Sequence, residues 1–436
     1  MSETTRAPEP SGTLWHGPMR RVLVSSFSGS VIEFYDFILY VIAAATVFPD
    51  VFFAGLDRTT ATIASFATLA VGYVARPVGG VIFGHFGDRI GRKGVLVTTM
   101  LIMGASTIAI GLLPSIATAG ALAPILLVCC RLLQGVAVGG EWGGAMLIAL
   151  ENAPGAKRGL AASFANLGAP AGAALATGSI SLASALPGDQ FLAWGWRVPF
   201  LLSVVLVIVG LVIRLKVSES PLFVRLERAA ERRRVPIVDV FRRYPLQVLF
   251  GVVVAISQLT IDGIVTSWAV NRAIELGADR TMVLNLKILA SVALFLMAVI
   301  GARVSDRVGR RPVLAAGIVA AMIFVLPLLN LVQAGTAGTF AIAAIIGQGI
   351  QGLILGPLAA FLAELFPTEL RFTGSSLCFQ TAATLGSGFT PLIATSLVAA
   401  TGGIAVLGLS WIAVLIVCIL ALAFTKEGRT RDLEAA

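Results

Sequence analysis

Two stretches of the chain, Gly84–Lys93 (GHFGDRIGRK) and Gly301–Arg311 (GARVSDRVGRR), carry the same pattern. Both contain Asp-Arg-x-Gly-Arg followed by a second basic residue and begin with a glycine, four residues before the aspartate in the first and five in the second; the aspartates, Asp88 and Asp306, lie 218 residues apart. Each stretch directly follows a long apolar segment. The same turn therefore stands at the same place in two parts of the chain, which indicates one unit written twice.

Two further pairs of landmarks support this duplication. ENAPGAKR (Glu151–Arg158) and ELFPTELR (Glu364–Arg371) share a glutamate, a proline and an arginine at the same spacing, 213 residues apart. Between the two kinds of turn, Gln134-Gly135 and Gln348-Gly349 match at an offset of 214. Three landmarks at nearly one offset are hard to obtain by chance.

The amino-acid composition is typical of a membrane protein. Hydrophobic residues make up 57% and charged residues only 13%, whereas soluble domains carry about 25% charged residues. The mean hydropathy is +0.93. Apolar runs of about 20 residues, long enough to cross a bilayer as helices, recur along the whole chain. We therefore expect an all-α membrane protein with twelve transmembrane helices in two six-helix halves. The expected spans are about 22–48, 60–85, 94–114, 121–149, 159–186, 195–216, 246–271, 282–302, 312–332, 339–363, 372–399 and 402–425.

The distribution of basic residues sets the expected orientation. Most of the 32 Lys and Arg lie on the tails and on the connections that follow even-numbered spans. Such an excess marks the cytoplasmic side of a membrane protein, so we expect both termini in the cytoplasm. The expected organisation is a cytoplasmic N-terminal tail, a first six-helix half, a cytoplasmic linker loop, a second six-helix half and a cytoplasmic tail, at residues 1–21, 22–216, 217–245, 246–425 and 426–436.

Several classes of function are disfavoured. The net charge of +9 follows the topology, so we expect contact with membrane lipid and no nucleic-acid partner. The chain has only two histidines, and its four cysteines lie in apolar segments. These residues do not show the spacing of metal ligands, so no metal site and no cofactor are expected. The sequence has no nucleophile triad and no phosphate-binding Gly-x-x-x-x-Gly-Lys loop, which argues against an enzyme or an ATP-driven pump.

The duplicated turn resembles the loop signature of the major facilitator superfamily. Three stretches, SFSGSVIEFYDFILY, GYVARPVGGVIFGHFGDRIGRK and RLLQGVAVGGEWGGA, are similar to those of the metabolite:proton symporter family, whose members take up organic acids and compatible solutes. The resemblance implies a twelve-helix fold in the cytoplasmic (inner) membrane and proton-coupled uptake of a small molecule. Two similar halves also suggest a site at their interface and alternating access by rocking. We expect the protein to work as a monomer.

Charges inside the apolar spans are the candidate coupling residues, because an intramembrane ionisable group is costly and usually functional. Glu33 and Asp36 lie in the first span, and Arg131 lies at a similar depth in the fourth. Our hypothesis is that Asp36 forms a pair with Arg131, and that protonation of Asp36 or binding of an anion breaks it. We therefore assign proton coupling to Asp36, Glu33 and Arg131, with a structural role as the alternative for each.

Other polar groups within the spans are candidates for substrate binding or gating. Arg131, Gln134 and Glu141 lie on one stripe of the fourth span, while Arg76 either binds a substrate carboxylate or pairs with Glu33 or Glu141. The candidate substrate-binding residues are Arg76, Arg131, Gln134, Glu141, Gln258, Asp262 and Gln351. The candidate gating residues are Gly84, Asp88, Arg89, Gly91, Arg92, Glu151, Arg158, Asp306, Arg307, Arg310, Glu364 and Arg371.

The substrate is left open by the sequence. A proton symporter for a small organic anion, such as a di- or tricarboxylate, a keto acid or a cyclic acid, fits the two mid-membrane arginines. Uptake of a zwitterion of the proline or betaine type is the alternative. The segment Gly168–Gly172 (GAPAG) loosely resembles a motif of drug:proton antiporters and keeps proton-coupled export as a third reading, although glycine and proline are common in membrane helices.

Overall fold

The computed structural model describes residues 17–217 and 236–428, and these residues are almost entirely helical, with no strand among them. The ends of both expected tails and most of the expected linker loop lie outside the described residues. The first half contains α1 (Gly17–Thr46), α2 (Phe48–Phe52), α3 (Arg58–Ile90), α4 (Arg92–Leu112), α5 (Ile116–Ala119), α6 (Leu122–Glu151), η1 (Gly155–Lys157), α7 (Arg158–Leu167), α8 (Ala169–Ala183), α9 (Gly188–Gln190), η2 (Phe191–Gly195) and α10 (Arg197–Leu215).

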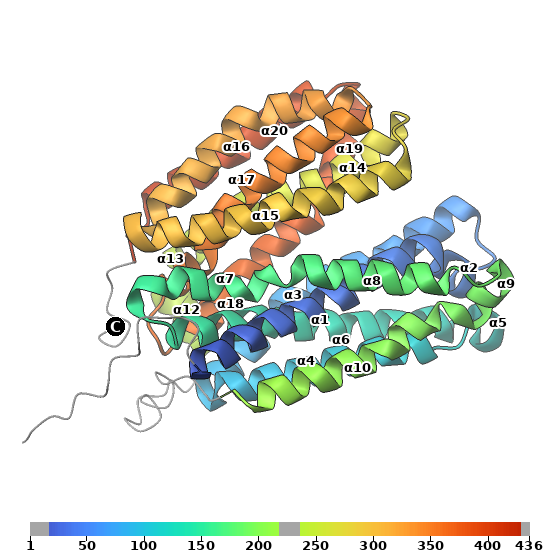
Figure 1. Cartoon of the computed structure of the whole chain (residues 1–436), viewed down its shortest axis with the longest axis horizontal. Helices are drawn as coiled ribbons and strands as arrows, with labels where there is room; N and C mark the ends of the chain where they lie inside the picture. The colour runs from blue at the N-terminus through green and yellow to red at the C-terminus, as the bar shows by residue number, and fades with distance from the viewer. Residues whose placement is uncertain (1–16, 218–235, 429–436) are drawn as a thin grey trace, which may run out of the picture.

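The second half repeats this plan. After α12 (Pro236–Arg243) come α13 (Pro245–Asp262), η3 (Gly263–Trp268), α14 (Ala269–Glu275), α15 (Arg280–Val308), α16 (Arg310–Gln333), α17 (Ala337–Glu364), α18 (Arg371–Ala383), η4 (Thr384–Gly388), α19 (Thr390–Thr401) and α20 (Ala405–Ala423). Figure 1 shows two helical bundles, one built from α1 to α10 and one from α13 to α20, which meet at the end where α12 and α18 begin.

Eleven helices of the described residues are long and apolar enough to cross a membrane, against the twelve spans expected. The difference falls on the expected span 159–186. This segment consists of two helices, α7 of 10 residues and α8 of 15 residues, divided at Gly168 just before Pro170. Proline has no backbone N–H, so it cannot donate the hydrogen bond that would continue the first helix. The two pieces follow one another across the bundle in Figure 1. Gly168 and Gly172 lie directly against the α1 backbone at Phe27–Tyr35, so this motif serves close packing of α8 on α1.

The duplicated turn has the same backbone in both halves. Gly91 separates α3 from α4 and Gly309 separates α15 from α16, each with φ of 112°. Residues with a side chain rarely adopt this conformation. The final glycine of the pattern is therefore required by the corner between two consecutive membrane helices.

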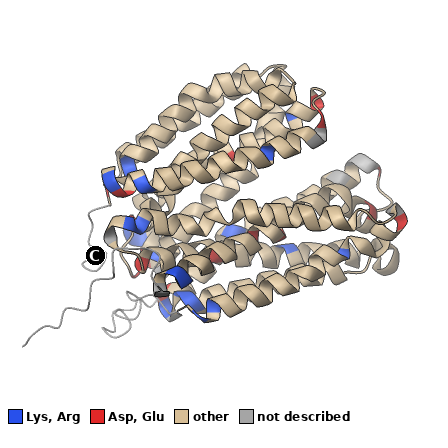
Figure 2. Ribbon diagram, viewed as in Figure 1, with Lys and Arg blue, Asp and Glu red and all other residues tan. Residues whose placement is uncertain are grey.

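Charged residues gather at one end of the molecule. Figure 2 shows Lys and Arg concentrated where the two duplicated turns lie, with few charged residues along the middle of the helices. We call this end, which carries Gly84–Lys93 and Gly301–Arg311, the basic end. The helix interiors between the two ends hold the few buried charges that form the candidate site.

Candidate functional site

A small polar cavity lies inside the first half, between α1, α3, α4 and α6. It brings together five of the expected site residues, and its free space is about that of one water molecule. Its lining is Glu33, Asp36, Phe37, Gly72, Arg76, Met103, Arg131, Gln134, Gly135 and Val138. Charges from three helices thus converge on one buried point.

Asp36 is the most enclosed acid of this cavity. Asp36 is only 3% exposed, and neither of its carboxylate oxygens has a hydrogen-bond partner among the described residues. The neighbouring Thr107 hydroxyl donates to the Met103 carbonyl at 3.0 Å instead. An ionised carboxylate in such a place is costly, because buried charges are normally paired and hydrogen-bonded. The negative charge of an ionised Asp36 would therefore have no hydrogen bond to offset its burial here.

Arg131 lies in the same cavity, but no hydrogen bond joins it to Asp36 in this conformation. The guanidinium donates to Gln134 Oε1 at 3.2 Å and lies over the Tyr40 ring, 4.1 Å from its centroid. Gln134 in turn donates to Thr107 Oγ1 at 2.7 Å. Asp36 and Arg131 thus line the same cavity, as their similar depths predicted. The expected ion pair between them is not formed here.

Arg76 is held by aromatic faces rather than by an acid. Its guanidinium carbon lies 4.5 Å from the Tyr73 ring centroid and 5.3 Å from that of Phe37. Such cation–π contacts hold a guanidinium in place without neutralising its charge. The Tyr73 carbonyl accepts a hydrogen bond from Thr384 Oγ1 of the second half at 2.8 Å, so Arg76 lies next to the boundary between the halves.

Two further acids expected in the site, Glu33 and Glu141, differ in surroundings. Glu33 is half-buried and lines the cavity. Glu141, expected among the substrate-binding residues, does not line it. Its Oε1 forms a buried ion pair with Arg214 of α10, and Arg214 also donates to the Leu96 carbonyl at 2.6 Å. The structure thus places Glu141 between the cavity and the basic end.

The candidate residues of the second half form a separate group. Gln351 Nε2 of α17 donates to Asp262 Oδ1 at 3.1 Å, and Asp262 is the last residue of α13, directly before the π-helical turn η3. Gln258 is 4% exposed, one turn earlier. None of the three lines the cavity of the first half.

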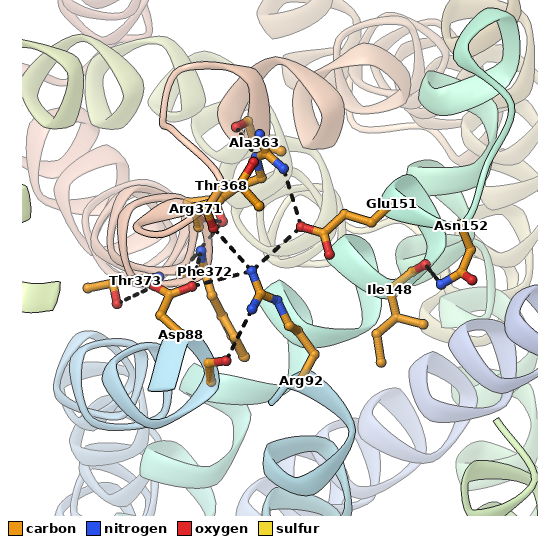
Figure 3. Close-up of polar contacts among 12 residues, drawn as sticks. Asp88, Arg92, Ile148, Glu151, Asn152, Ala363, Thr368, Arg371, Phe372 and Thr373 are labelled. Atoms are coloured by element: carbon orange, nitrogen blue, oxygen red, sulfur yellow. Dashed lines mark hydrogen bonds and ion pairs between the residues drawn. The ribbon is translucent and has the colours of Figure 1, made fainter. Parts of the chain in front are cut away.

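At the basic end, a cluster of buried charges joins the first half to α18 (Figure 3). Asp88 accepts hydrogen bonds from the backbone N–H of Phe372 at 3.2 Å and of Thr373 at 2.9 Å. These N–H groups belong to the first turn of α18, where the helix itself leaves donors unsatisfied. A carboxylate of the first half therefore caps a helix of the second half, and it is favoured there by the helix dipole.

Arginines complete this cluster of buried charges. Arg92 lies 3.5 Å from Asp88 and 3.6 Å from Glu151, and Arg371 of the second half lies 3.3 Å from Glu151. Arg92 also donates across the boundary to the Thr368 carbonyl at 3.2 Å. We call the group Asp88, Arg92, Glu151 and Arg371, with the α18 N-terminus, the first lock (Figure 3).

The second lock repeats this arrangement with the halves exchanged. Asp306 accepts hydrogen bonds from the backbone N–H of Gly159 at 2.8 Å and of Leu160 at 3.1 Å, in the first turn of α7. Arg310 lies 2.6 Å from Asp306 and 3.2 Å from Glu364. In each half the duplicated aspartate thus caps a helix of the other half. We call Asp306, Arg310 and Glu364, with the α7 N-terminus, the second lock.

Not every residue of the duplicated turns belongs to a lock. Arg89 and Arg307, one position after the aspartates, are exposed, whereas Arg92 and Arg310 are fully buried. Glycine is required at position 84 because α3 touches α18 there. A Cβ added to Gly84 would come within 2.7 Å of Thr373 Cα. Arg158 begins α7, the helix that Asp306 caps.

Known proteins resemble both halves of this chain. The family described as "Sugar (and other) transporter" matches residues 22–237, and "Major Facilitator Superfamily" matches residues 251–435. The inner membrane metabolite transport protein YhjE of Escherichia coli (strain K12) is 40% identical over 420 residues, 95% of each chain. The chain belongs to the major facilitator superfamily.

Other relatives and a solved structure agree with this membership. The shikimate transporter of Escherichia coli (strain K12) is 39% identical over 91% of each chain, and the proline/betaine transporter of the same strain is 31% identical over 96% of this chain and 86% of its own. The proton:xylose symporter XylE bound to 6-bromo-6-deoxy-D-glucose superimposes with a TM-score of 0.78 at 19% identity, covering 96% of this chain and 98% of XylE. This superfamily member is thus a multi-pass membrane transporter of metabolites and not an enzyme.

Two parts of the site escaped the sequence reasoning on this major facilitator. Arg214 lies near the basic end of its helix, where arginines read as topology signals, and nothing in its position indicated a buried ion pair. Thr373, which adds a hydroxyl donor to Asp88 at 2.8 Å, could have been found from Asp88 only by knowing that the caps cross between the halves.

Proposed function

We propose that this chain is a proton symporter that takes up a small organic anion by alternating access. The observation that carries the proposal is Asp36, a buried carboxylate with no hydrogen-bond partner among the described residues, in one cavity with two arginines. The names of the relatives support metabolite transport, and a carrier named for shikimate favours an organic acid.

The charges of the cavity couple the proton to the anion. With both acids ionised, Glu33 and Asp36 balance Arg76 and Arg131, and an incoming anion gains little. With both acids protonated, the two arginines are unbalanced in a medium of low dielectric, where attraction for an anion is strong. Protonation and anion binding then strengthen each other by the same factor, which is the requirement for symport.

The two locks provide the gate. Both hold the halves together at the basic end, which we place in the cytoplasm because of its Lys and Arg. While the locks are formed, the substrate has no exit on that side. Release requires both aspartates to leave the helix ends they cap, after which the halves can rock apart there.

The proposal is tested by uptake into liposomes that contain the purified protein. The panel is radiolabelled shikimate, citrate, 2-oxoglutarate, proline and betaine, each measured with and without an inward proton gradient. We expect an organic acid to accumulate only with the gradient. Indifference of every compound to the gradient would contradict proton symport.

The residue assignment has its own variant. Asp36→Asn cannot exchange a proton, so gradient-driven accumulation should fall at least tenfold while some exchange of labelled for unlabelled substrate remains. Asp239→Asn is the control, since the half-buried Asp239 pairs at 3.3 Å with the exposed Arg243 of its own helix α12, away from the cavity lining. Accumulation at the wild-type level in Asp36→Asn would show that another group carries the proton.

A zwitterionic compatible solute is the second candidate. Asp262, bonded by Gln351 in the second half, supplies the negative group that a positively charged nitrogen would need, and the proline/betaine relatives favour this reading. In the same panel, gradient-dependent uptake of proline or betaine in place of the organic acids would decide for it.

A further inference from the structure

Polar side chains recur where α1 and α6 face each other, between the cavity and the basic end. On α1 the facing positions have spacings of three and four residues, which place them on one face of the helix. The facing positions are Ser26, Gly29, Glu33 and Asp36 on α1, and Arg131, Gln134, Val138, Glu141 and Ala145 on α6. We call this the α1–α6 seam.

Contacts fix how the two faces of the seam lie against each other. At the cavity, Asp36 and Arg131 line the same space. At the other end, Ser26 Oγ donates to the Ala145 carbonyl at 3.1 Å. The two helices therefore run antiparallel along the seam. The ten residues from Ser26 to Asp36 span about 15 Å at 1.5 Å per residue.

The ion pair of Glu141 and Arg214 lies in the middle of the seam, against α1. An added Cβ at Gly29 would come within 3.3 Å of Glu141 Oε1 and would also collide with the Arg214 guanidinium. Glycine at this position thus lets the pair reach the α1 backbone. Glu33 lies four residues after Gly29, one helical turn further along the same face of α1.

The seam is hollow at both ends. One end is the Asp36 cavity. The other is a second small cavity at the basic end, also with room for about one water molecule. It is lined by Ser25, Ser26, Lys93, Leu96, Ala145, Ile148, Arg214 and Val217. Lys93 is half-buried and donates to the Leu215 carbonyl at 2.8 Å, so this cavity lies close to the surface of the basic end.

Polar atoms along the seam lack partners within the described part of the chain. They include Glu141 Oε2 and Arg214 Nε, in addition to both oxygens of Asp36. Buried polar groups are nearly always satisfied by protein or by water, and buried waters bridge such groups. A row of unpaired atoms between two water-sized spaces is the setting in which water molecules can link acids.

We propose that the proton released by Asp36 travels along the α1–α6 seam, inside the first half, while the substrate leaves between the halves. This inference rests on the proposed symport. Glu33 first gives its own proton to Glu141 Oε2, which passes it to water in the second cavity. The Asp36 carboxyl then gives its proton to the Glu33 carboxylate, and this second proton follows the same route. At each step one O–H bond breaks, another forms, and the donor is left as a carboxylate.

The charged groups around the seam support this direction of transfer. Arg76 and Arg131 face the Asp36 cavity, and Arg214 holds its own protons and stabilises the Glu141 carboxylate once that acid has given up its proton. Each acid therefore has a cation nearby.

Two charges of the seam have no counterpart in the second half. At the offset of 214 that matches Gln134 to Gln348, Arg131 and Glu141 correspond to Ile345 and Leu355. The fold is built from both halves, so these charges are not needed to form it. Their presence in one half alone points to a function.

The test records proton and substrate fluxes separately, with a pH-sensitive dye inside liposomes and the most strongly accumulated compound of the panel outside. In Glu141→Gln, the proton influx that accompanies the substrate should fall at least tenfold, while exchange of labelled for unlabelled substrate continues. Asp239→Asn, which removes the ion pair with Arg243 of α12, should leave both fluxes unchanged.

Two outcomes separate this inference from the proposed function. A wild-type protein without substrate-linked proton influx would overturn both. A coupled wild-type protein whose Glu141→Gln variant keeps full proton influx would overturn the seam alone. If Glu141→Gln shows no exchange either, Ser26→Ala decides, because it removes the hydroxyl that lines the second cavity without touching the ion pair. Proton influx should fall at least threefold, and an unchanged influx would overturn the seam.

Discussion

Replacement of Asp88 by asparagine should open the basic end. In this structure the Asp88 carboxylate accepts the Phe372 and Thr373 N–H groups on different oxygens, at 3.2 and 2.9 Å. An amide keeps one acceptor oxygen and presents an NH₂ group to the other donor. The variant Asp88→Asn therefore loses at least one bond to α18 and the negative charge at its N-terminus, while the fold within each half is untouched.

The magnitude follows from these contacts. A hydrogen bond to a charged group contributes about 1.5–3 kcal/mol, and a charge at a helix N-terminus about 0.3–1 kcal/mol. Arg92 lies 3.5 Å from Asp88 and 3.6 Å from Glu151. In the variant it keeps Glu151 as an ionic partner, so the loss of the Asp88 charge costs this arginine little. We expect the locked state to lose about 2–3 kcal/mol, which shifts its ratio to the opened state about 30- to 140-fold at about 1.4 kcal/mol per factor of ten.

Spin labels measure this shift directly. Cysteines at the exposed positions Arg89 and Arg307, one in each half, carry the labels in a chain whose native cysteines are replaced. In Asp88→Asn, the longer distances between the labels should gain population. A distribution like that of the unsubstituted chain, or an equal shift in Asp239→Asn, would refute the assignment of Asp88 as a lock.

Two more predictions concern the same boundary. Asp306→Asn should lengthen the same label distance to a similar degree, because Asp306 caps α7 with two bonds of 2.8 and 3.1 Å; a double variant with Asp88→Asn that opens no further than either single variant would contradict two separate locks. Gly84→Ala should also favour the opened state, since its Cβ would come within 2.7 Å of Thr373 Cα, whereas Gly94→Ala, with nothing within 4 Å, should not. Equal distance distributions in the two alanine variants would count against close contact at Gly84.

The sequence was most informative where the chain repeats itself. The duplicated turn predicted two matching gates, and both aspartates lie in buried clusters. It could not show that each aspartate caps a helix of the opposite half, because periodicity within one helix says nothing of what that helix meets. For the same reason it did not separate the exposed Arg89 and Arg307 from the buried Arg92 and Arg310.

Within the spans, depth was predictable and pairing was not. Counting residues along two helices placed Asp36 and Arg131 at one level, and they line one cavity. Their side chains then choose among several neighbours, and Arg131 lies against Gln134 and Tyr40 instead. Glu141 was expected to face the interior, but its partner Arg214 comes from a helix whose rotation periodicity alone did not fix.

The crossed caps have a consequence for how this protein can change over evolutionary time. Each copy of the duplicated turn finishes a helix encoded in the other copy, so neither copy is free to drift alone. A substitution at Asp88 must be compensated by a change near Phe372 and Thr373, which lie more than 280 residues away in the sequence. The two halves are therefore bound to each other as an inherited pair, and a half exchanged for that of a distant relative would bring a cap that does not fit.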